Sequence, residues 1–393
     1  MRLIRDSSWL LNPSLGVSLL LLAIIIAGVP TFGFDAEWII ISLGGLLALH
    51  LGVEASGRIR EGGSGERSLL LLGEAITFLL LSVSFGGIAG HQAPLLALLS
   101  LITLNLSAIL VKSGRRRFPL YSLTVYSAGI LFTVHSFAQY GSWAAVRSLP
   151  LTPPEGAFGM FLIFISFPSI LQWLVNWNRK ILSTLFIALS ITIMLLHGFR
   201  ADAALIILST FLILWRRYPR ISYAFILSLL ALFLLVDVIR TNLSVPVSER
   251  PIFRLSTTYY YSKEVLKWFS FLVPPQGPLW ILSIPLHPSQ SIGRGIFGKE
   301  YGITPTMFVG LSIASGIFGM LVLSAIIGLL AGYSYRLFLR ERDMFSYAII
   351  WPLLITRVEI GMSQLDLALV MGSVVFAILA NLFNGEHSAT SVK

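Results

Sequence analysis

Long apolar runs, separated by short charged clusters, recur along almost the whole chain. Most are continuous for about 17 to 25 residues, close to the length that crosses a bilayer as a helix, and they lack the alternation of a β-strand. We count twelve of them, at residues 13–30, 37–54, 68–86, 93–111, 118–138, 157–177, 181–198, 201–215, 221–239, 306–333, 344–361 and 365–383. We therefore predict an all-α polytopic membrane protein with about twelve transmembrane helices, forming a single transmembrane domain over residues 1–393.

The composition supports a membrane protein. The chain is 56% hydrophobic and 12% charged, whereas about a quarter of the residues are charged in soluble domains. The first run follows Arg2 and Arg5 and opens a series of similar runs, so we interpret it as a retained signal-anchor helix. There is no cysteine, which excludes thiol catalysis. A net charge of +10 would suggest nucleic acid in a soluble protein, but here it follows the membrane topology, and we expect no nucleic acid.

The basic residues alternate between the connections, as the positive-inside rule requires. With a cytoplasmic N-terminus, the inner segments hold most of them: Arg2, Arg5, Arg58, Arg60, Arg67, Lys112, Arg115, Arg116, Arg117, Arg179, Lys180, Arg216, Arg217, Arg220, Arg336, Arg340 and Arg342. The short outer loops hold only Arg147, Arg200 and Arg357. We therefore predict a multi-pass protein of the cytoplasmic membrane with both termini in the cytoplasm.

One connection, residues 240–305, is long and is predicted to lie outside, between the ninth and tenth spans. It carries seven cations and three acids and is rich in aromatic residues. Within it, Tyr261, Val265, Trp268, Phe269 and Leu272 share one helical face, with Lys263, Lys267 and Ser270 on the other. This pattern predicts an amphipathic helix lying against the outer leaflet.

Arg200 lies in a hairpin too short to lift it out of the membrane. Between Lys180 and Arg216 there are 35 residues, whereas two crossings need about 20 residues each. The turn at residues 197–202 is therefore expected near the outer edge of the hydrocarbon. A guanidinium at that depth costs a few kcal/mol or more unless it faces protein, water or an anion, so the turn is a candidate anion site.

Arg357 repeats this argument. It follows Asp343 by 14 residues, about 21 Å of helix. Either it forms an ion pair with a neighbouring acid such as Glu359 or Asp366, or it binds an anion. Arg240 has a similar alternative, a local pair with Asp237 or snorkelling to the interface.

Together with Arg254 and Arg294 in the long loop, the three membrane-edge arginines Arg200, Arg240 and Arg357 would place several guanidiniums on one rim. Guanidiniums suit bidentate binding of phosphate or carboxylate. The headgroup of a polyprenyl diphosphate would match both the charge and the depth.

Residues that could act as a general base on the outer side are His287, Glu300 and His197. The glycine-rich stretch 287–306 around the first two could also bring backbone N–H groups to an anion, although such turns are common in any loop. No metal-binding pattern is visible, and we predict no metal. There is no P-loop or nucleotide domain, which excludes ATP hydrolysis within this chain.

Three short motifs carry a family resemblance. They are Gly198-Phe199-Arg200-Ala201-Asp202 at the tight turn, Ile303-Thr304-Pro305-Thr306 followed by Gly310, and Ser315-Gly316-Ile317-Phe318-Gly319. With the long outer loop rich in Arg and Tyr, they resemble the Wzy-type oligosaccharide repeat-unit polymerases, which are relatives of the O-antigen ligases. The resemblance covers roughly residues 195–335 and rests otherwise on the layout of the spans.

The resemblance implies a GT-C-like membrane glycosyltransferase that works without a cofactor or metal. It would transfer a glycan from a polyprenyl-diphosphate carrier to another lipid-linked glycan at the outer face, with arginines gripping the diphosphate. Arg200 matches the arginine of the short turn, and Arg254 and Arg294 match those of the long loop. His287 is the candidate for the functional histidine of the ligases. Asp202 departs from the pattern and could pair with Arg200.

The expected partners are the lipid-linked oligosaccharide and membrane lipids, with other polysaccharide-export proteins as candidates. We expect Tyr259, Tyr260, Trp268 and Tyr301 to contact glycan or lipid. In the mechanism we favour, His287 or Glu300 deprotonates the acceptor hydroxyl and the arginines stabilise the leaving diphosphate.

Other classes stay open. The chain could be a lipid-linked oligosaccharide flippase or another twelve-helix secondary transporter. Such folds usually have two related halves and charges near the midplane, whereas here the charges favour the outer edge. An O-antigen-ligase-like enzyme with a different acceptor and a non-catalytic scaffold are further alternatives.

Overall fold

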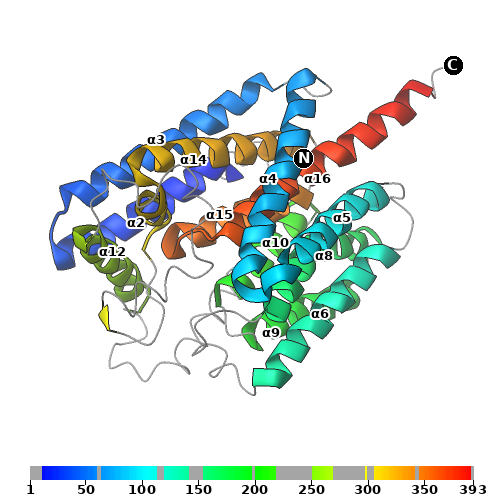
Figure 1. Ribbon diagram of the computed structural model, residues 1–393, viewed down its shortest axis with the longest axis horizontal. Helices are drawn as coiled ribbons and strands as arrows, with labels where there is room; N and C mark the ends of the chain where they lie inside the picture. Colours follow the sequence, from blue (N-terminus) through cyan, green and yellow to red (C-terminus); the bar gives the residue numbers. More distant parts are fainter. Residues whose placement is uncertain are drawn as a thin grey trace.

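The computed structural model describes residues 11–59, 63–112, 119–140, 154–196, 200–217, 250–268, 297–298, 305–340 and 345–390 (Figure 1). All regular secondary structure in this part of the chain is helical, and no strand is present in it. Its twelve α-helices are α2 (Pro13–Phe32), α3 (Ala36–Ala55), α4 (Ser64–Ala89), α5 (Ala93–Lys112), α6 (Leu120–Tyr140), α8 (Pro154–Asn176), α9 (Lys180–Leu196), α10 (Arg200–Arg217), α12 (Arg250–Trp268), α14 (Met307–Leu339), α15 (Phe345–Ile360) and α16 (Gln364–Thr390). Two short 3₁₀ turns accompany them, at Ser56–Arg58 and Gly90–Gln92.

Eleven of the twelve predicted runs coincide with a helix, and the run at 221–239 lies outside the described residues. Among the described helices, six are long and apolar enough to cross a membrane: α2, α3 with the turn after it, α4, α6, α8 and α14. Four shorter apolar helices lie within α5, α9, α10 and α16. The chain is therefore a polytopic helical membrane protein. The count of twelve spans stays a prediction.

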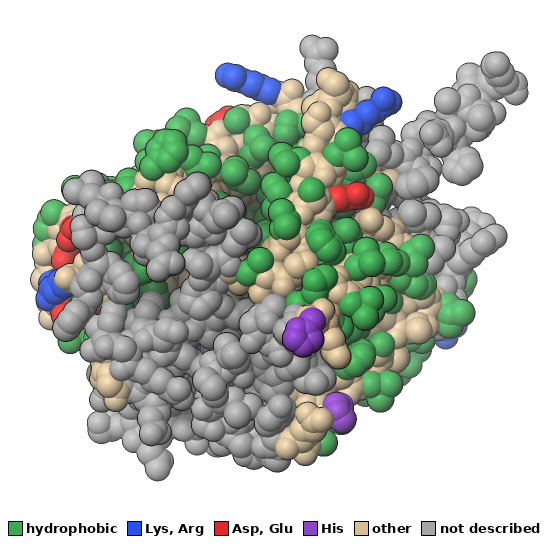
Figure 2. Space-filling view, in the orientation of Figure 1, with side chains coloured by type: hydrophobic (Ala, Val, Ile, Leu, Met, Phe, Trp, Pro, Cys, Tyr) green, Lys and Arg blue, Asp and Glu red, His purple; other side chains and the backbone are tan. Residues whose placement is uncertain are grey.

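The outward faces of the helices are apolar. Ile26, Ile40 and Leu71 are each more than 60% exposed, although a soluble protein would avoid such a surface. Figure 2 shows hydrophobic side chains over α4, α5 and α6, with only scattered charged ones. By contrast, 89% of the residues in the apolar stretch of α8 are buried. Helix α8 therefore lies inside the bundle, against α4, α5, α6, α9, α10 and α15, and the apolar outer faces of the other helices are suited to lipid.

Glycines allow the closest helix contacts. A Cβ atom added to Gly52 of α3 would lie 2.0 Å from the backbone oxygen of Ala325, and one added to Gly328 of α14 would lie 2.0 Å from that of Leu49. Small residues at such positions let helix backbones approach in a membrane, where apolar burial alone does not favour association over lipid. The pair α3–α14 is therefore fixed by backbone contact.

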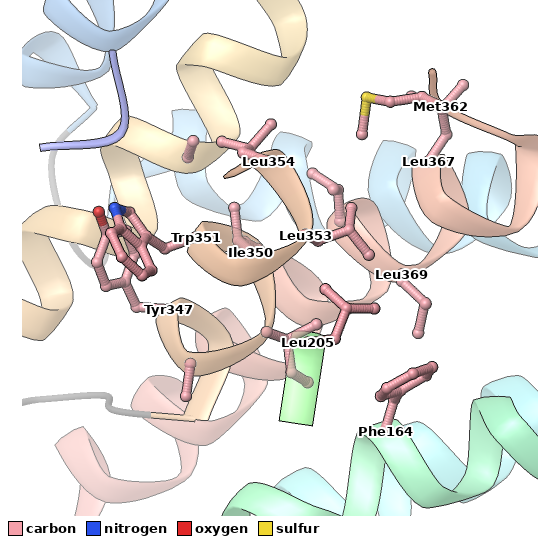
Figure 3. Packing of buried hydrophobic residues seen from close by; sticks show 14 of the residues in the cluster. Phe164, Leu205, Tyr347, Ile350, Trp351, Leu353, Leu354, Met362, Leu367 and Leu369 are labelled. Carbon is pink, nitrogen blue, oxygen red and sulfur yellow. The ribbon is translucent and has the colours of Figure 1, made fainter. Parts of the chain in front are cut away.

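The core beside α8 holds together the helices that carry the candidate site. Phe164 of α8, Leu205 of α10 and Leu369 of α16 converge on Leu353 of α15 (Figure 3). All four are buried. This packing brings the first turns of α10 and α16 to the same end of the bundle as the last turn of α15.

Helix ends that the charge pattern places on the same side of the membrane contact one another in the structure. At the end predicted to be inner, Tyr347 donates a hydrogen bond to the carbonyl oxygen of Leu11, and Tyr333 donates one to Glu66 at 2.5 Å. At the other end, α12 contacts the turn after α2. The described part of the long loop, α12, therefore meets the short turn between α2 and α3, which is also predicted to be outer.

Two features differ from the sequence predictions. First, within α12 (Arg250–Trp268), Val265 of the predicted lipid-facing side is fully buried and packs against Tyr261, Phe297 and Ile313. Phe269, Leu272 and the side chain of Trp268, which complete that side, lie outside the described residues. The predicted lipid-facing side of this helix therefore packs, at least in part, on protein.

Second, the run predicted at 306–333 is a helix broken at Gly316, which has φ 65° and ψ 173°. Glycine adopts this left-handed φ without the clash that a Cβ would cause. The 23 residues after the break span about 35 Å, enough to cross the hydrocarbon. The segment before the break, which starts at Met307, is therefore an additional helical piece at the end where α12 lies.

Candidate functional site

The buried centre of the site is Arg357. It lies 12 residues into α15, about 18 Å from the start of the helix, and its side chain is 12% exposed. Its Nη2 donates to Oδ1 of Asp366 at 2.9 Å and to Oδ1 of Asp202 at 3.3 Å. Of the two alternatives that the sequence leaves open, the ion pair with a neighbouring acid is therefore the one seen. Asp202 is a second partner that the sequence did not indicate.

Local structure explains why both acids are held in place. Ser363 precedes α16, and its backbone N–H and hydroxyl each lie 2.8 Å from Oδ2 of Asp366, whose own N–H donates to the Ser363 hydroxyl oxygen. This is a capping box, which satisfies the free N–H groups of a first turn. Asp202 lies in the first turn of α10, where the helix dipole favours a carboxylate.

Arg357, Asp202 and Asp366 form a trio that connects the ends of three helices but carries little positive charge. One guanidinium faces two carboxylates, so the trio carries one formal negative charge when all three groups are ionised. Within the described residues, the Nε of Arg357 is buried without a hydrogen-bond partner. The depth of Arg357 is thus explained by its two acids, and the trio alone is not an anion site.

A second ion pair, more exposed, joins α12 to α15. The Nε of Arg254 donates to Oε1 of Glu359, which lies two residues beyond Arg357. The side chains are 44% and 21% exposed, respectively. Within the part of the chain described, the terminal nitrogens of Arg254 have no hydrogen-bond partner. Of the two predicted diphosphate-binding arginines whose side chains are described, Arg254 is therefore the one with exposed donors left for a ligand, since Arg357 is buried.

Helix α12 is anchored firmly enough to fix the position of Arg254. The hydroxyl of Tyr259 donates to the carbonyl oxygen of Gly33 at 3.0 Å, and Nζ of Lys263 donates to that of Phe32 at 2.8 Å. On the other side, the hydroxyl oxygen of Ser262 accepts from the N–H of Thr306 at 2.9 Å. The helix thus bridges the α2–α3 turn and the start of α14.

The aromatic residues predicted to contact glycan or lipid differ in how deeply they are buried. Tyr259 is fully buried, its ring centroid 4.7 Å from that of Trp38, so a glycan contact there would require α12 to leave α2. Tyr260 is half-buried, with its ring centroid 4.9 Å from that of Phe32. The side chain of Trp268 and the whole of Tyr301 lie outside the described residues.

The remaining predicted site residues cannot be placed against this geometry. Arg200 begins α10, two residues before Asp202, but its side chain is not among those described. Arg240, Arg294, His287, Glu300 and His197 lie outside the described residues. Among those described, no group of three or more His, Asp or Glu side chains could hold a metal ion.

The sequence named Glu359 and Asp366 as candidate ion-pair partners of Arg357. Asp366 is such a partner, whereas Glu359 pairs with Arg254, 105 residues away, which the sequence did not indicate. A usable signal existed for Asp366, because Ser363 and Asp366 have the spacing of a capping box.

The fold and the site define a polytopic helical membrane protein with clustered arginines and acids at one end of its bundle. The sequence matches the model of the family described as "Putative O-antigen polymerase" over residues 10–371. Because this match covers nearly the whole chain, the protein belongs to the O-antigen polymerase family, and the resemblance found in the sequence is confirmed. Comparisons with curated proteins and with solved structures find no match.

Membership of this family defines the general activity. The protein is a glycosyltransferase-like membrane polymerase of O-antigen repeat units, and its substrates are lipid-linked oligosaccharides. The flippase or secondary-transporter alternative is not favoured by this match.

Proposed function

We propose that the protein transfers a glycan from a polyprenyl-diphosphate carrier to another lipid-linked glycan at the outer face of the cytoplasmic membrane. The site at the meeting point of α10, α12, α15 and α16 would bind the carrier diphosphate. The single observation that carries this proposal is Arg254 beside Glu359, with terminal nitrogens that have no hydrogen-bond partner among the described residues. An arginine of this kind can bind a phosphate through two parallel hydrogen bonds.

The predicted arginines have different roles in binding the diphosphate in this proposal. Arg254 and Arg200 are the main diphosphate ligands, because Arg200 begins the helix whose first turn contacts Arg357. Arg294 and Arg240 are further ligands predicted from the sequence alone. Arg357 is given a smaller direct part, because two carboxylates already neutralise it. Its contribution would be to hold the turn that carries Arg200.

In the proposed reaction, the acceptor hydroxyl displaces the diphosphate directly at the anomeric carbon. The arginines would stabilise the charge that develops on the leaving diphosphate, as preorganised donors do for other leaving groups. The fold would be GT-C-like, and neither a cofactor nor a metal ion takes part, so extension should continue in the presence of EDTA.

The test is chain extension by the purified protein in liposomes that contain lipid-linked repeat units. Arg254→Ala should lower the rate of extension at least about 100-fold, the loss typical for a group that stabilises a developing anion. Arg254→Lys should keep part of the activity, because it retains the charge but not the fork of donors. A rate for Arg254→Ala equal to that of the natural protein would refute the proposal.

Lys267→Ala is the matched control. Lys267 lies on the same helix, is 55% exposed and forms its own ion pair with Glu264 at 2.6 Å. Removing it changes the charge of α12 by the same amount as Arg254→Ala does, but away from Glu359. Its rate of extension should stay within about twofold of the natural protein, since a distant exposed pair contributes little.

A further inference from the structure

We propose that Glu359 is the general base that deprotonates the acceptor hydroxyl, and that the carrier diphosphate frees it by taking Arg254 from it. This inference rests on the proposed function, and it assigns the base to a residue of α15 in place of the loop candidates His287 and Glu300. The observation behind it is the Arg254–Glu359 ion pair at the accessible edge of the site.

The described acids of this region differ in what they can reach. Asp202 and Asp366 are 8% and 6% exposed in their side chains, and both are held on the buried guanidinium of Arg357. Glu359 is 21% exposed. Its Oε1 accepts from Arg254, and no hydrogen bond to its Oε2 is seen from the described residues. Glu359 is therefore the acid of this group with an oxygen available to an acceptor hydroxyl.

The position of Glu359 also fits a base. It follows Arg357 by two residues at the end of α15, and Arg357 is fixed by its ion pairs with Asp202 and Asp366 in the first turns of α10 and α16. A base must stand within hydrogen-bond reach of the proton it removes. A carboxylate beside the arginine that binds the leaving group meets this need, because donor and acceptor come together at the anomeric carbon.

The ion pair further suggests how the donor prepares the base. A diphosphate has more charge and more acceptor oxygens than one carboxylate, so it competes well for a guanidinium. Once the diphosphate holds Arg254, Glu359 loses that partner and is left with an unshared carboxylate. Binding of the donor would thus come before activation of the acceptor.

The bonds and charges of the step balance. The acceptor O–H gives its proton to Glu359 while its oxygen bonds to the anomeric carbon of the donor glycan. The bond from that carbon to the phosphate oxygen breaks, and its electron pair goes to the diphosphate held by the arginines. Glu359 afterwards releases the proton to water, so no oxidant, reductant or further reactant is needed.

The experiment measures chain extension and donor affinity separately, in liposomes with purified protein and lipid-linked repeat units. Glu359→Gln keeps an oxygen that can accept from Arg254 but cannot take a proton. We expect its rate at saturating donor to fall at least 100-fold, within the 10²- to 10⁴-fold range of general-base catalysis. Its donor affinity should stay within about threefold, or increase, because Arg254 remains in place.

The matched control is Glu264→Gln. Glu264 is 23% exposed, close to the 21% of Glu359, and it too is paired with a cation of α12. Its loss should leave the rate within about twofold, as for other exposed pairs. His287→Ala and Glu300→Gln test the two loop candidates in the same assay, and both should extend chains at saturating donor much faster than Glu359→Gln.

Chemical rescue separates a base from a residue that only holds α12 in position. Formate should restore part of the rate of Glu359→Ala, because a small carboxylate can enter the space left and accept the proton. Glu359→Asp, which keeps a carboxylate on a shorter side chain, should retain measurable activity and shows whether the site still folds.

Several outcomes would overturn the inference. They are a near-normal rate for Glu359→Gln, a loss of donor affinity with an unchanged saturating rate, or rescue by formate of His287→Ala but not of Glu359→Ala. If the natural protein itself fails to extend chains, the proposed function fails. If it extends chains and Glu359→Gln does so equally well, only the assignment of Glu359 fails.

Discussion

Removing the carboxylate of Asp366 should destabilise the protein strongly, because that group has two tasks. It pairs with Arg357 at 2.9 Å and caps the first turn of α16 through Ser363. Breaking a buried ion pair typically costs 3–5 kcal/mol, and we take about 3 because Asp202 stays on Arg357. Loss of a cap adds about 1 kcal/mol. Asp366→Ala should therefore lower the free energy of unfolding by about 4 kcal/mol.

Two further variants separate the contribution of the ion pair to this loss of stability from that of the helix cap. Ser363→Ala removes one capping hydroxyl and leaves the ion pair, so it should cost only about 1 kcal/mol. In Arg357→Met, two buried carboxylates lose their cation. Combining it with Asp366→Ala should cost less than the sum of the single changes, because residues in contact are energetically coupled.

The assay is equilibrium unfolding in mixed detergent micelles, followed by tryptophan fluorescence. The reasoning would be refuted if Asp366→Ala and Ser363→Ala destabilised the protein equally. It would also be refuted by additivity of Arg357→Met and Asp366→Ala, since the two side chains would then not be in contact.

Three further predictions concern other parts of the fold. In Gly28→Val, a Cβ would lie 2.3 Å from Cγ of Tyr259, so α12 should separate from α2. The chain has no cysteine of its own, and disulfide cross-linking between cysteines introduced into α2 and α12 should therefore fall, whereas undiminished cross-linking would contradict the packing. Gly328→Val should lower the melting temperature in detergent by several degrees, because a Cβ there meets the backbone oxygen of Leu49 at 2.0 Å; an unchanged melting temperature would argue against the α3–α14 contact. Arg200→Ala should severely reduce chain extension while the protein still inserts into the membrane, and undiminished product length in this variant would remove Arg200 from the site.

The helices were predictable because each depends on a local property of the sequence. A run of apolar residues long enough to span the hydrocarbon is sufficient to predict a helix there. The starts of α3, α10 and α15 agree with the predicted runs within one residue. The break at Gly316 was not predicted, because nothing in the hydropathy of this run separates a broken helix from a continuous one.

The contacts of α12 depend on its neighbours and could not be predicted from its own pattern. Tyr261 and Val265 form an apolar face in the sequence, and such a face can meet either lipid or protein. The packing of Val265 against Ile313 depends on the helix piece before Gly316, which the sequence did not reveal.

For Arg357, the sequence predicted the need for a partner and offered Asp366 among the candidates, but it did not indicate Asp202. The depth argument identified Arg357 correctly as a charge that needs a partner, because helix length alone sets its position. Its partners Asp202 and Asp366 come from the first turns of two other helices, 155 residues before it and nine after it. Hydropathy and spacing do not say which helix ends meet.

The most direct test of diphosphate binding at Arg254 is a structure of the protein in lipid nanodiscs with a non-transferable polyprenyl-diphosphate-linked repeat unit. We predict phosphate oxygens within about 3 Å of the Arg254 guanidinium, with the carboxylate of Glu359 released and facing the glycan. A diphosphate more than about 8 Å from Arg254, too far for any direct hydrogen bond, with the Arg254–Glu359 pair intact, would contradict the prediction.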